Sequence, residues 1–262
     1  MWLLTSCDLT FDISVETPFV LMMRPHSDAN QWIAFEKYEI VPSVPVFEFT
    51  DIYGNLCQRL MAPVGKFSIH TATKVKTTDV IEEVSGVPFI EIQNLPENVL
   101  IYLLPSRYCE ADRFSNMAQE ITEGRLLGYD QVVAIKEWLR ENISFEPNDS
   151  SSIVSAIEVN ARKYGVCRDL SHLAIALCRS LSIPARMVVG YCYGLVPMDL
   201  HAWFEVYVGN RWYTFDATQA QLRGGYVTIG YGRDAADVAV YNQFGPALYP
   251  SSQKIEVELI EE

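Results

Sequence analysis

Short apolar runs alternate with turn-forming residues over the first hundred positions of the chain. The runs cover residues 19–23, 44–49, 67–71 and 99–104, and prolines at positions 42, 45, 63, 88, 96 and 105 punctuate them. Runs of this length between turn residues are typical of antiparallel β-strands. We therefore predict a β-sandwich-like domain over residues 1–110. Its simplest role is to cover or position the rest of the chain, and a role in binding substrate is the sharper alternative.

Helical spacing replaces this pattern in the second half of the chain. Apolar residues from Val132 to Leu139 recur three and four positions apart, and Asp130 is the expected N-cap. Residues 153–164 form a second predicted helical segment. The pattern changes within residues 106–128, and we place the boundary after residue 110, so that residues 111–262 form the second domain.

The most regular apolar stripe begins three residues after Cys167. It follows the spacing of one helix face at Leu170, Leu173, Ala174, Leu177, Cys178 and Leu181. Cys167 continues the stripe and therefore falls in the first turn of the predicted helix. The unpaired N–H groups and the positive dipole end of a helix start favour a thiolate there. Asp169 is interpreted as a first-turn cap or support for the site.

Two alternating runs further along predict a β-hairpin. Residues 201–208 and 211–216 flank Gly209-Asn210, a dipeptide typical of two-residue hairpin turns. With this turn Val208 pairs with Arg211, which places position 203 opposite Asp216. His201 then lies on the same face as Asp216, as a diagonal neighbour at about 7–8 Å between backbones. A slip of one residue would place Asp216 on the other face.

Cys167, His201 and Asp216 together supply a nucleophile, a base and an orienting acid. A carboxylate beside an imidazole fixes its tautomer, while the other ring nitrogen meets the thiol. The noncatalytic alternative is that a cysteine on an apolar helix face is a small buried hydrophobic residue. We interpret Cys178 and Cys192 in this way. A zinc site built on Cys167 and His201 is disfavoured, because the sequence has no closely spaced pair of ligands.

Other polar residues near these positions have a structural and a functional interpretation. Arg168 and Arg186 are candidates to bind a substrate carbonyl or carboxylate, although ion pairs with Asp169 and Glu205 are the more common outcome. His172 points well away from the cysteine around the predicted helix, so we interpret it as structural.

Composition narrows the choice of partners. The chain has 262 residues and a formal net charge of −13, which argues against a surface for nucleic acid or for an anionic membrane. A neutral or cationic peptide or protein substrate fits better. The six cysteines show no Cys-x-x-Cys pair, and the N-terminus has no basic region or long apolar run. We therefore expect reduced cysteines and a cytoplasmic location; the sequence leaves the oligomeric state open.

Several segments closely resemble the transglutaminase-like superfamily, whose bacterial members often have a β-rich N-terminal region. They are GVCRDLSHL at 165–173, HAWFE at 201–205, WYTFDAT at 212–218, DIYGN at 51–55 and GYGRDAADV at 230–238. The resemblance implies an α+β fold with a papain/transglutaminase-like core, in which a helix bearing the nucleophile packs on an antiparallel sheet. It assigns Cys167 as nucleophile, His201 as base and Asp216 as orienting acid.

The chain departs from the family pattern at two places. Ala217 follows the acid where the family usually has proline, which affects the turn but keeps the carboxylate. Ala161 stands six residues before the cysteine, where papain-like enzymes carry the glutamine of the oxyanion hole. Asn160 or a tryptophan is then a candidate donor beside the Cys167 backbone N–H.

The resemblance implies acyl transfer through a thioester on Cys167, without a metal or an organic cofactor. Hydrolysis would make the protein a thiol protease or amidase, and the bacterial relatives favour this outcome. Attack by an amine would make it a crosslinking transglutaminase. A nonprotein amide as substrate and a noncatalytic binding module of the same fold are further alternatives.

Overall fold

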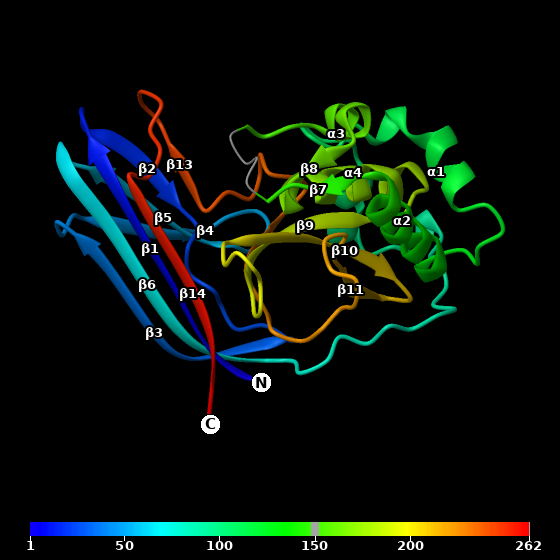
Figure 1. Ribbon diagram of the computed structural model, residues 1–262, viewed down its shortest axis with the longest axis horizontal. Helices are drawn as coiled ribbons and strands as arrows, with labels where there is room; N and C mark the ends of the chain where they lie inside the picture. The colour runs from blue at the N-terminus through cyan, green and yellow to red at the C-terminus, as the bar shows by residue number, and fades with distance from the viewer. Residues whose placement is uncertain (148–151, 262) are drawn as a thin grey trace.

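Two β-sheets face each other in one half of the computed structural model, which describes residues 1–147 and 152–261 (Figure 1). Both sheets have four strands, in the orders β14-β1-β6-β3 and β13-β2-β5-β4. All neighbouring strands in them are antiparallel. The strands are β1 (Trp2–Ile13), β2 (Thr17–Leu21), β3 (Gln31–Val41), β4 (Val46–Thr50), β5 (Leu56–Ala62), β6 (Gly65–Thr77), β13 (Tyr241–Gln243) and β14 (Ser252–Ile260).

Aromatic side chains fill the space between these two sheets. Every second residue of β1 is buried from Leu3 to Ile13, because successive side chains of a strand point to opposite faces. Phe11 and Phe67 of the first sheet meet Phe19 of the second, with ring centroids 5.3 and 6.0 Å from Phe19. The predicted β-sandwich is therefore confirmed as an element of the fold.

The strand predicted at residues 99–104 is wrong. This segment belongs to the 3₁₀ helix η2 (Glu97–Leu103). Val99 and Tyr102 stand three positions apart, and both are buried; the Tyr102 ring packs against Trp212 at 5.3 Å. The run is as apolar as a strand, but its buried positions repeat every three residues, as in a 3₁₀ helix. The runs at 19–23, 44–49 and 67–71 do overlap β2, β4 and β6.

The sandwich also takes strands from the other end of the chain. Strand β14 pairs with β1 along most of its length, from Trp2 opposite Ile260 to Thr10 opposite Ser252. Strand β13 pairs with β2. These two strands lie in the part of the chain that the sequence analysis assigns to the second domain. The division into residues 1–110 and 111–262 stays a prediction, with a sandwich that draws on both parts.

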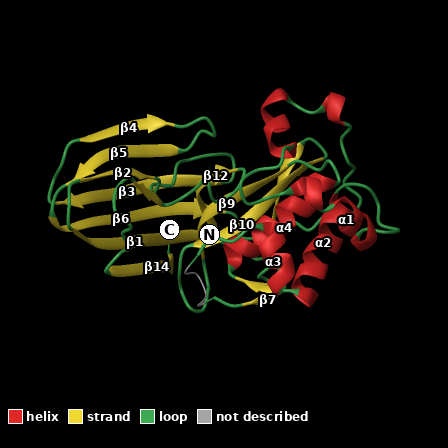
Figure 2. Cartoon of the chain, turned by 90° about the horizontal axis from the view of Figure 1, so that it is seen from above, coloured by secondary structure: helices red, strands yellow, loops and turns green. Residues whose placement is uncertain are grey.

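The other half of the molecule is built around helix α4 (Cys167–Ser180), which lies between other helices and an antiparallel sheet of order β11-β10-β9-β12 (Figure 2). The sheet consists of β9 (Ala185–Cys192), β10 (His201–Val208), β11 (Arg211–Phe215) and β12 (Tyr226–Gly232). The other elements are η1 (Ile92–Asn94), η3 (Ala111–Arg113), α1 (Ser115–Ile121), α2 (Tyr129–Asn142), α3 (Ala156–Arg162) and a parallel pair of short strands, β7 (Ser144–Phe145) and β8 (Tyr164–Gly165).

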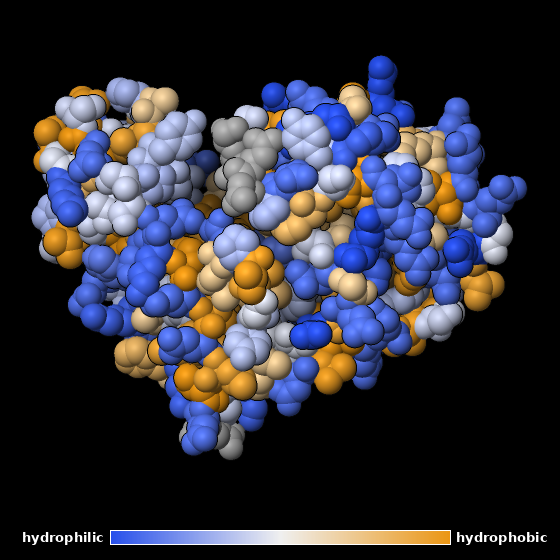
Figure 3. Space-filling view, in the orientation of Figure 1, coloured by the Kyte–Doolittle hydropathy of each residue, from blue (hydrophilic) through white to orange (hydrophobic). Residues whose placement is uncertain are grey.

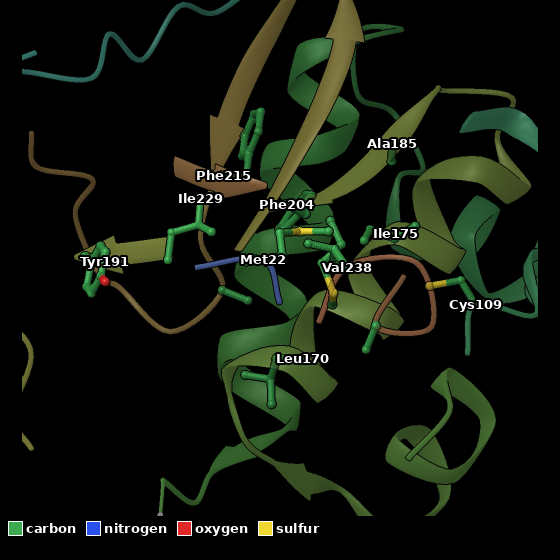
Figure 4. Packing of buried hydrophobic residues seen from close by; sticks show 14 of the residues in the cluster. Met22, Cys109, Leu170, Ile175, Ala185, Tyr191, Phe204, Phe215, Ile229 and Val238 are labelled. Atoms are coloured by element: carbon green, nitrogen blue, oxygen red, sulfur yellow. The ribbon is translucent and has the colours of Figure 1, made fainter. Parts of the chain in front are cut away.

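Helix α4 is buried from Asp169 to Arg179, so it forms the centre of this half. Ile175 of the helix and Phe204 of β10 belong to one buried cluster and lie close together in Figure 4. Phe204 stacks on Phe215 of the neighbouring strand at 5.7 Å. The predicted arrangement, a helix that begins with the cysteine and packs on an antiparallel sheet, is confirmed.

The prediction that Asp130 caps α2 is wrong. The N-cap is Gly128, whose φ of 103° is a conformation that glycine adopts without strain. Asp130 lies inside the first turn, where its carboxylate accepts hydrogen bonds from Ser85 Oγ at 2.6 Å and from the Gly86 N–H at 2.7 Å. The carboxylate thus fixes the loop before the helix rather than the helix end.

Helix α3 is shorter than the predicted segment 153–164. It begins after Ser155, whose backbone N–H donates to the Glu158 carboxylate at 2.7 Å. It ends at Lys163, which adopts the left-handed conformation with φ of 64°. A reciprocal cap at one end and a left-handed residue at the other are ordinary helix boundaries.

Two buried amide side chains of the sandwich hydrogen-bond to β12 of the other half. Gln31 accepts from the Thr228 N–H at 2.7 Å and donates to its carbonyl at 2.8 Å. Asn55 makes the same pair of bonds with Tyr231, at 2.8 and 2.7 Å. The strand has a register shift between Thr228 and Gly230. The amides therefore satisfy backbone groups of β12 on either side of an irregularity and join the two halves.

None of the helices in the described residues is both long enough and apolar enough to cross a membrane.

Candidate active site

Cys167 is the first residue of α4, and it is the cysteine that is only partly buried. The other five cysteines are free and buried. Asp169 is fully buried below it and accepts hydrogen bonds from the Val166 N–H at 3.3 Å and from Arg162 at 2.8 Å. Gly165 is required here, because a Cβ at this position would lie 2.8 Å from the Cβ of Asp169. The interpretation of Asp169 as a support of the helix start is confirmed.

The hairpin after the helix has the predicted register. Val208 pairs with Arg211 and Phe204 pairs with Phe215, which places Asp216 just beyond the end of β11 and opposite position 203. Gly209 and Asn210 form the turn with φ values of 54° and 65°, as a two-residue hairpin of this type requires. The side chains of His201 and Asp216 meet, with Nε2 of the imidazole 2.6 Å from Oδ2 of the carboxylate.

Asp216 is held by a complete set of hydrogen bonds although it is buried. Its Oδ1 accepts from the Thr218 N–H at 2.8 Å and from Thr218 Oγ1 at 2.7 Å. Its Oδ2 accepts from Tyr226 Oη at 2.9 Å as well as from His201. Ala217 in place of proline therefore leaves the turn intact, since Thr218 still anchors the carboxylate. Burial followed by the Asp216 charge raises the pKa of Tyr226, so the phenol remains a donor.

Tyr226 is a site residue that the sequence analysis missed. It lies on β12, ten residues after Asp216, and no local motif links the two. Its place at the site depends on the pairing of β12 with β9, where Tyr226 lies opposite Cys192. The sequence offers only one indication of Tyr226, a β-prone run with tyrosines that follows the hairpin.

The electrostatics of the site favour a charged pair of His201 and Asp216. Burial acts to lower the pKa of His201, but the charge and hydrogen bond of Asp216 outweigh it, and a hydrogen bond with the Cys167 side chain adds to the effect. The pKa of His201 is raised to about 10. Burial acts to raise the pKa of Asp216, but the His201 charge and the Thr218 hydrogen bonds hold it below its usual value. Because Nε2 is bonded to Asp216, Nδ1 is the ring nitrogen left for Cys167.

Aromatic rings shield this pair from solvent. The Trp203 ring lies nearly parallel to the His201 ring, with centroids 6.1 Å apart, and it meets Tyr226 edge-on at 5.0 Å. Trp203 is buried, and its indole N–H has no hydrogen-bond partner among the described residues. Water is kept from the pair on this side, which strengthens the attraction between the two charges.

The two arginines considered in the sequence analysis are ion-paired. Arg168 Nε donates to Asp169 at 3.0 Å. Arg186 donates to Glu205 at 2.6 and 2.8 Å, and its guanidinium lies 4.1 Å from the centre of the Trp212 ring. The structural interpretation of both residues is confirmed.

His172 is also structural, as predicted. Its Nδ1–H donates to the Val154 carbonyl at 2.9 Å, its Nε2 accepts from the Ala235 N–H at 3.2 Å, and its ring stacks on Tyr108. Burial lowers the pKa of His172 to about 4. The neutral ring is therefore a fixed part of the packing behind the site.

A cleft of about 1000 Å³ opens over Cys167 and His201. The sandwich contributes Tyr241 of β13 and Gln253 of β14 to its wall, while α4 and β10 contribute Cys167 and His201. Figure 3 shows the surface indented between the two halves of the molecule. Asn160, a candidate oxyanion donor, does not line the cleft and instead accepts a hydrogen bond from Lys163 at 2.7 Å.

No group of three or more His, Cys, Asp or Glu side chains suited to a metal ion occurs in residues 1–147 and 152–261.

Comparison with known proteins places this site in a family. Residues 115–217 match the model of the transglutaminase-like superfamily. A candidate cysteine protease from Cytophaga hutchinsonii, known from a crystal structure, is 32% identical in sequence to this chain. The two structures superpose with a TM-score of 0.92 over 100% of this chain and 91% of the Cytophaga chain. The uncharacterized protein ML0607 of Mycobacterium leprae is 25% identical over 231 residues, which are 83% of this chain and 82% of that protein. The chain belongs to the transglutaminase-like superfamily.

Proposed function

We propose that the protein is a thiol hydrolase that cleaves peptide or other amide bonds through a thioester on Cys167. The observation that carries this proposal is the buried contact of 2.6 Å between His201 and Asp216, beside a partly exposed cysteine at a helix start. Cys167 and His201 line a cleft that is large enough for a peptide segment. The similarity to a candidate cysteine protease along the whole chain supports the same reaction class.

In the first half of the reaction the Cys167 sulfur attacks the amide carbonyl carbon. The C–N bond then breaks, and protonated His201 gives its Nδ1 proton to the departing amine, which leaves a thioester and a neutral imidazole. In the second half, His201 takes a proton from water, the hydroxide oxygen attacks the thioester, and the sulfur leaves. The product is a carboxylic acid, and the protein returns to its starting state.

Two other features of the site support these steps. Asp216 stabilises the positive charge that His201 carries, since the carboxylate accepts from Nε2 and is held by Thr218 and Tyr226. The N–H of Cys167 opens the helix, where the first N–H groups have no partner within the helix. It is suited to stabilise the oxyanion that forms on the carbonyl oxygen.

Transamidation is the second candidate, because an amine can resolve the same thioester. The cleft and its polar groups are compatible with either water or an amine as the second nucleophile. Identification of the reaction products therefore distinguishes hydrolysis from transamidation. Hydrolysis is favoured by the full-length similarity to a candidate cysteine protease. A module that binds without turnover would not need a charged histidine next to the partly exposed thiol. The raised pKa of His201 therefore argues against this alternative.

The test is turnover of a library of end-blocked peptide amides in ¹⁸O-labelled water, with products identified by mass spectrometry. Hydrolysis puts one ¹⁸O atom into each new carboxylic acid, whereas addition of a diamine such as cadaverine reveals transamidation by a different product mass. We expect Cys167→Ala to abolish turnover, and Cys178→Ala, which removes a sulfur from the same helix away from the cleft, to retain it. Turnover that survives Cys167→Ala would overturn the proposal.

A further inference from the structure

Asp199 is the acidic side chain in the described lining of the cleft that holds Cys167 and His201. It belongs to the loop between β9 and β10 and stands two residues before His201. Its Oδ1 accepts from the Leu200 N–H at 2.7 Å and from Gln253 Nε2 at 2.8 Å. Both bonds are made to one oxygen, so Oδ2 is left for another donor. Gln253 lies on β14, so the sandwich fixes the position of this carboxylate.

Asp199 forms no ion pair with a lysine or an arginine among the described residues. Its bonds are to an amide and to a backbone N–H, and neither carries a charge. Arg168 and His201 are the basic residues in the described lining, and they are paired with Asp169 at 3.0 Å and with Asp216 at 2.6 Å. In the described lining, Asp199 is therefore a negative charge without an ion-pair partner of its own, on which the charge of His201 also acts.

Apolar side chains line the cleft together with this charge. The loop that carries it contributes Leu195, Val196, Pro197 and Leu200 to the lining, and Tyr249 and Pro250 contribute from the segment before β14. Although Asp199 is accessible to solvent, the walls of the cleft displace part of its surrounding water, and this burial raises its pKa. A carboxylate that has lost part of its hydration is stabilised when a cation binds beside it, because the cation offsets the unfavourable free energy of desolvation.

Resting on the proposed function, we infer that Asp199 makes the cleft select substrates with a cationic group on an aliphatic stem. Lysine and arginine side chains have this chemistry, since their stems pack on apolar surface while their charged heads reach a polar partner. The same cation can belong to the amide that is cleaved or to an amine that attacks the thioester. Asp199 is a specificity determinant in either case, and Gln253 is a positioning residue for it.

The first test measures the charge preference of the cleft without any substrate. Cys167 is modified with three methanethiosulfonates: a cationic ethyltrimethylammonium, an anionic ethylsulfonate and a neutral methyl reagent, the last serving to normalise each variant. The test variant is Asp199→Asn, which keeps an oxygen acceptor for Leu200 and Gln253. The control is Asp12→Asn, which removes the same charge from an exposed position outside the cleft lining.

We expect the ratio of cation rate to anion rate to fall roughly three- to tenfold in Asp199→Asn, as the loss of one nearby charge predicts. The ratio in Asp12→Asn stays within a factor of two of the parent. Asp199→Lys lowers the ratio further and favours the anionic reagent. An unchanged ratio in Asp199→Asn would overturn the inference.

The second test separates this inference from the proposed reaction and identifies the source of the cation. Peptide amides that differ only in arginine or citrulline compete for turnover in ¹⁸O-labelled water, with and without cadaverine. Preference for arginine that is lost in Asp199→Asn places the cation on the cleaved substrate, and preference only for cadaverine places it on the attacking amine. Turnover without either preference overturns the Asp199 inference alone. No turnover, with the reagent ratio still dependent on Asp199, overturns the proposed reaction alone.

Discussion

At the residue scale, the central feature is a histidine that carries a positive charge in a buried place. The charge is tolerated because Asp216 lies 2.6 Å away and is itself held by Thr218 and Tyr226. A buried charge is costly unless it is paired and hydrogen-bonded, and both conditions are met here. The same arrangement presents the other ring nitrogen to Cys167, so one set of contacts stabilises the charge and orients it for chemistry.

Asp216→Asn tests this pairing. The amide keeps much of the shape but removes the negative charge, so we expect kcat/KM on a cleaved peptide amide to fall roughly 10²- to 10⁴-fold. The pKa of His201, about 10 in the parent, falls toward or below its ordinary value, so the alkaline limit of the pH–rate profile moves to lower pH. Asp130→Asn, at a carboxylate with two hydrogen bonds outside the cleft, serves as control. A variant with parental kcat/KM would contradict the assigned role of Asp216.

His172 gives a second prediction at this scale, on stability. Its pKa of about 4 in the folded protein lies below the ordinary value of 6.5, so the unfolded state binds more protons between these values. The stability that the neutral ring contributes is present above pH 6.5 and is lost as the pH falls toward 4, by about 3 kcal/mol in total.

Urea unfolding from pH 7 to pH 4 measures this loss. It should be smaller in His172→Asn, whose amide N–H can replace Nδ1–H toward the Val154 carbonyl. Equal slopes of stability against pH in the parent and in His172→Asn would show that His172 does not titrate as described.

At the element scale, the parts that the sequence predicts are those fixed by near neighbours. The hairpin register follows from Gly209-Asn210, because the turn alone determines which residues face each other. The position of Cys167 at the start of α4 follows from an apolar stripe within one helix. Residues 99–104 show the limit, because composition does not separate a strand from a 3₁₀ helix. Tyr226 was not predictable, because its place depends on the long-range pairing of β12 with β9.

The hydrogen bonds of the Gln31 and Asn55 amides to β12 give a prediction at the same scale. Asn55 is fully buried, and its removal leaves the Tyr231 N–H and carbonyl without these partners. We expect Asn55→Ala to lower the free energy of unfolding by about 2–4 kcal/mol, since two buried polar groups lose their hydrogen bonds. Asn30→Ala, at an exposed asparagine, should change it by less than about 0.5 kcal/mol. Urea titration measures the free energy of unfolding of both variants. An equally small decrease in the two would show that the Asn55–Tyr231 hydrogen bonds do not stabilise the fold.

At the scale of the whole molecule, strands from both ends of the sequence lie in the sandwich, and the half that holds Cys167 and His201 comes between them in the sequence. Strand β14 covers one side of β1, and Gln253 on the same strand reaches the cleft at Asp199. The sandwich is therefore more than a cover, because its last strand completes both its own sheet and the wall of the cleft. The sequence pattern could not reveal this, because a strand near residue 255 pairs with one near residue 7 without any local signal.

A chain that ends at residue 250 tests the role of β14. It lacks the partner of β1 and the buried Ile255 and Val257. We expect hydrogen exchange of those β1 amides that donate to β14 to accelerate at least tenfold, because this edge of the strand loses its row of hydrogen bonds, whereas the pairing with β6 remains. Amides of α4 should keep most of their protection. Unchanged exchange in β1 would show that the pairing with β14 is not a stable part of the fold.

The central claim is that Cys167 is activated by the charged pair of His201 and Asp216, and the most direct measurement is its rate of alkylation. Iodoacetamide labelling is followed at each cysteine by mass spectrometry from pH 4 to pH 9, in the parent, His201→Ala and Asp216→Asn. The account predicts rapid labelling confined to Cys167 in the parent and at least tenfold slower labelling of Cys167 in both variants. Equal rates at Cys167 in all three proteins would contradict it.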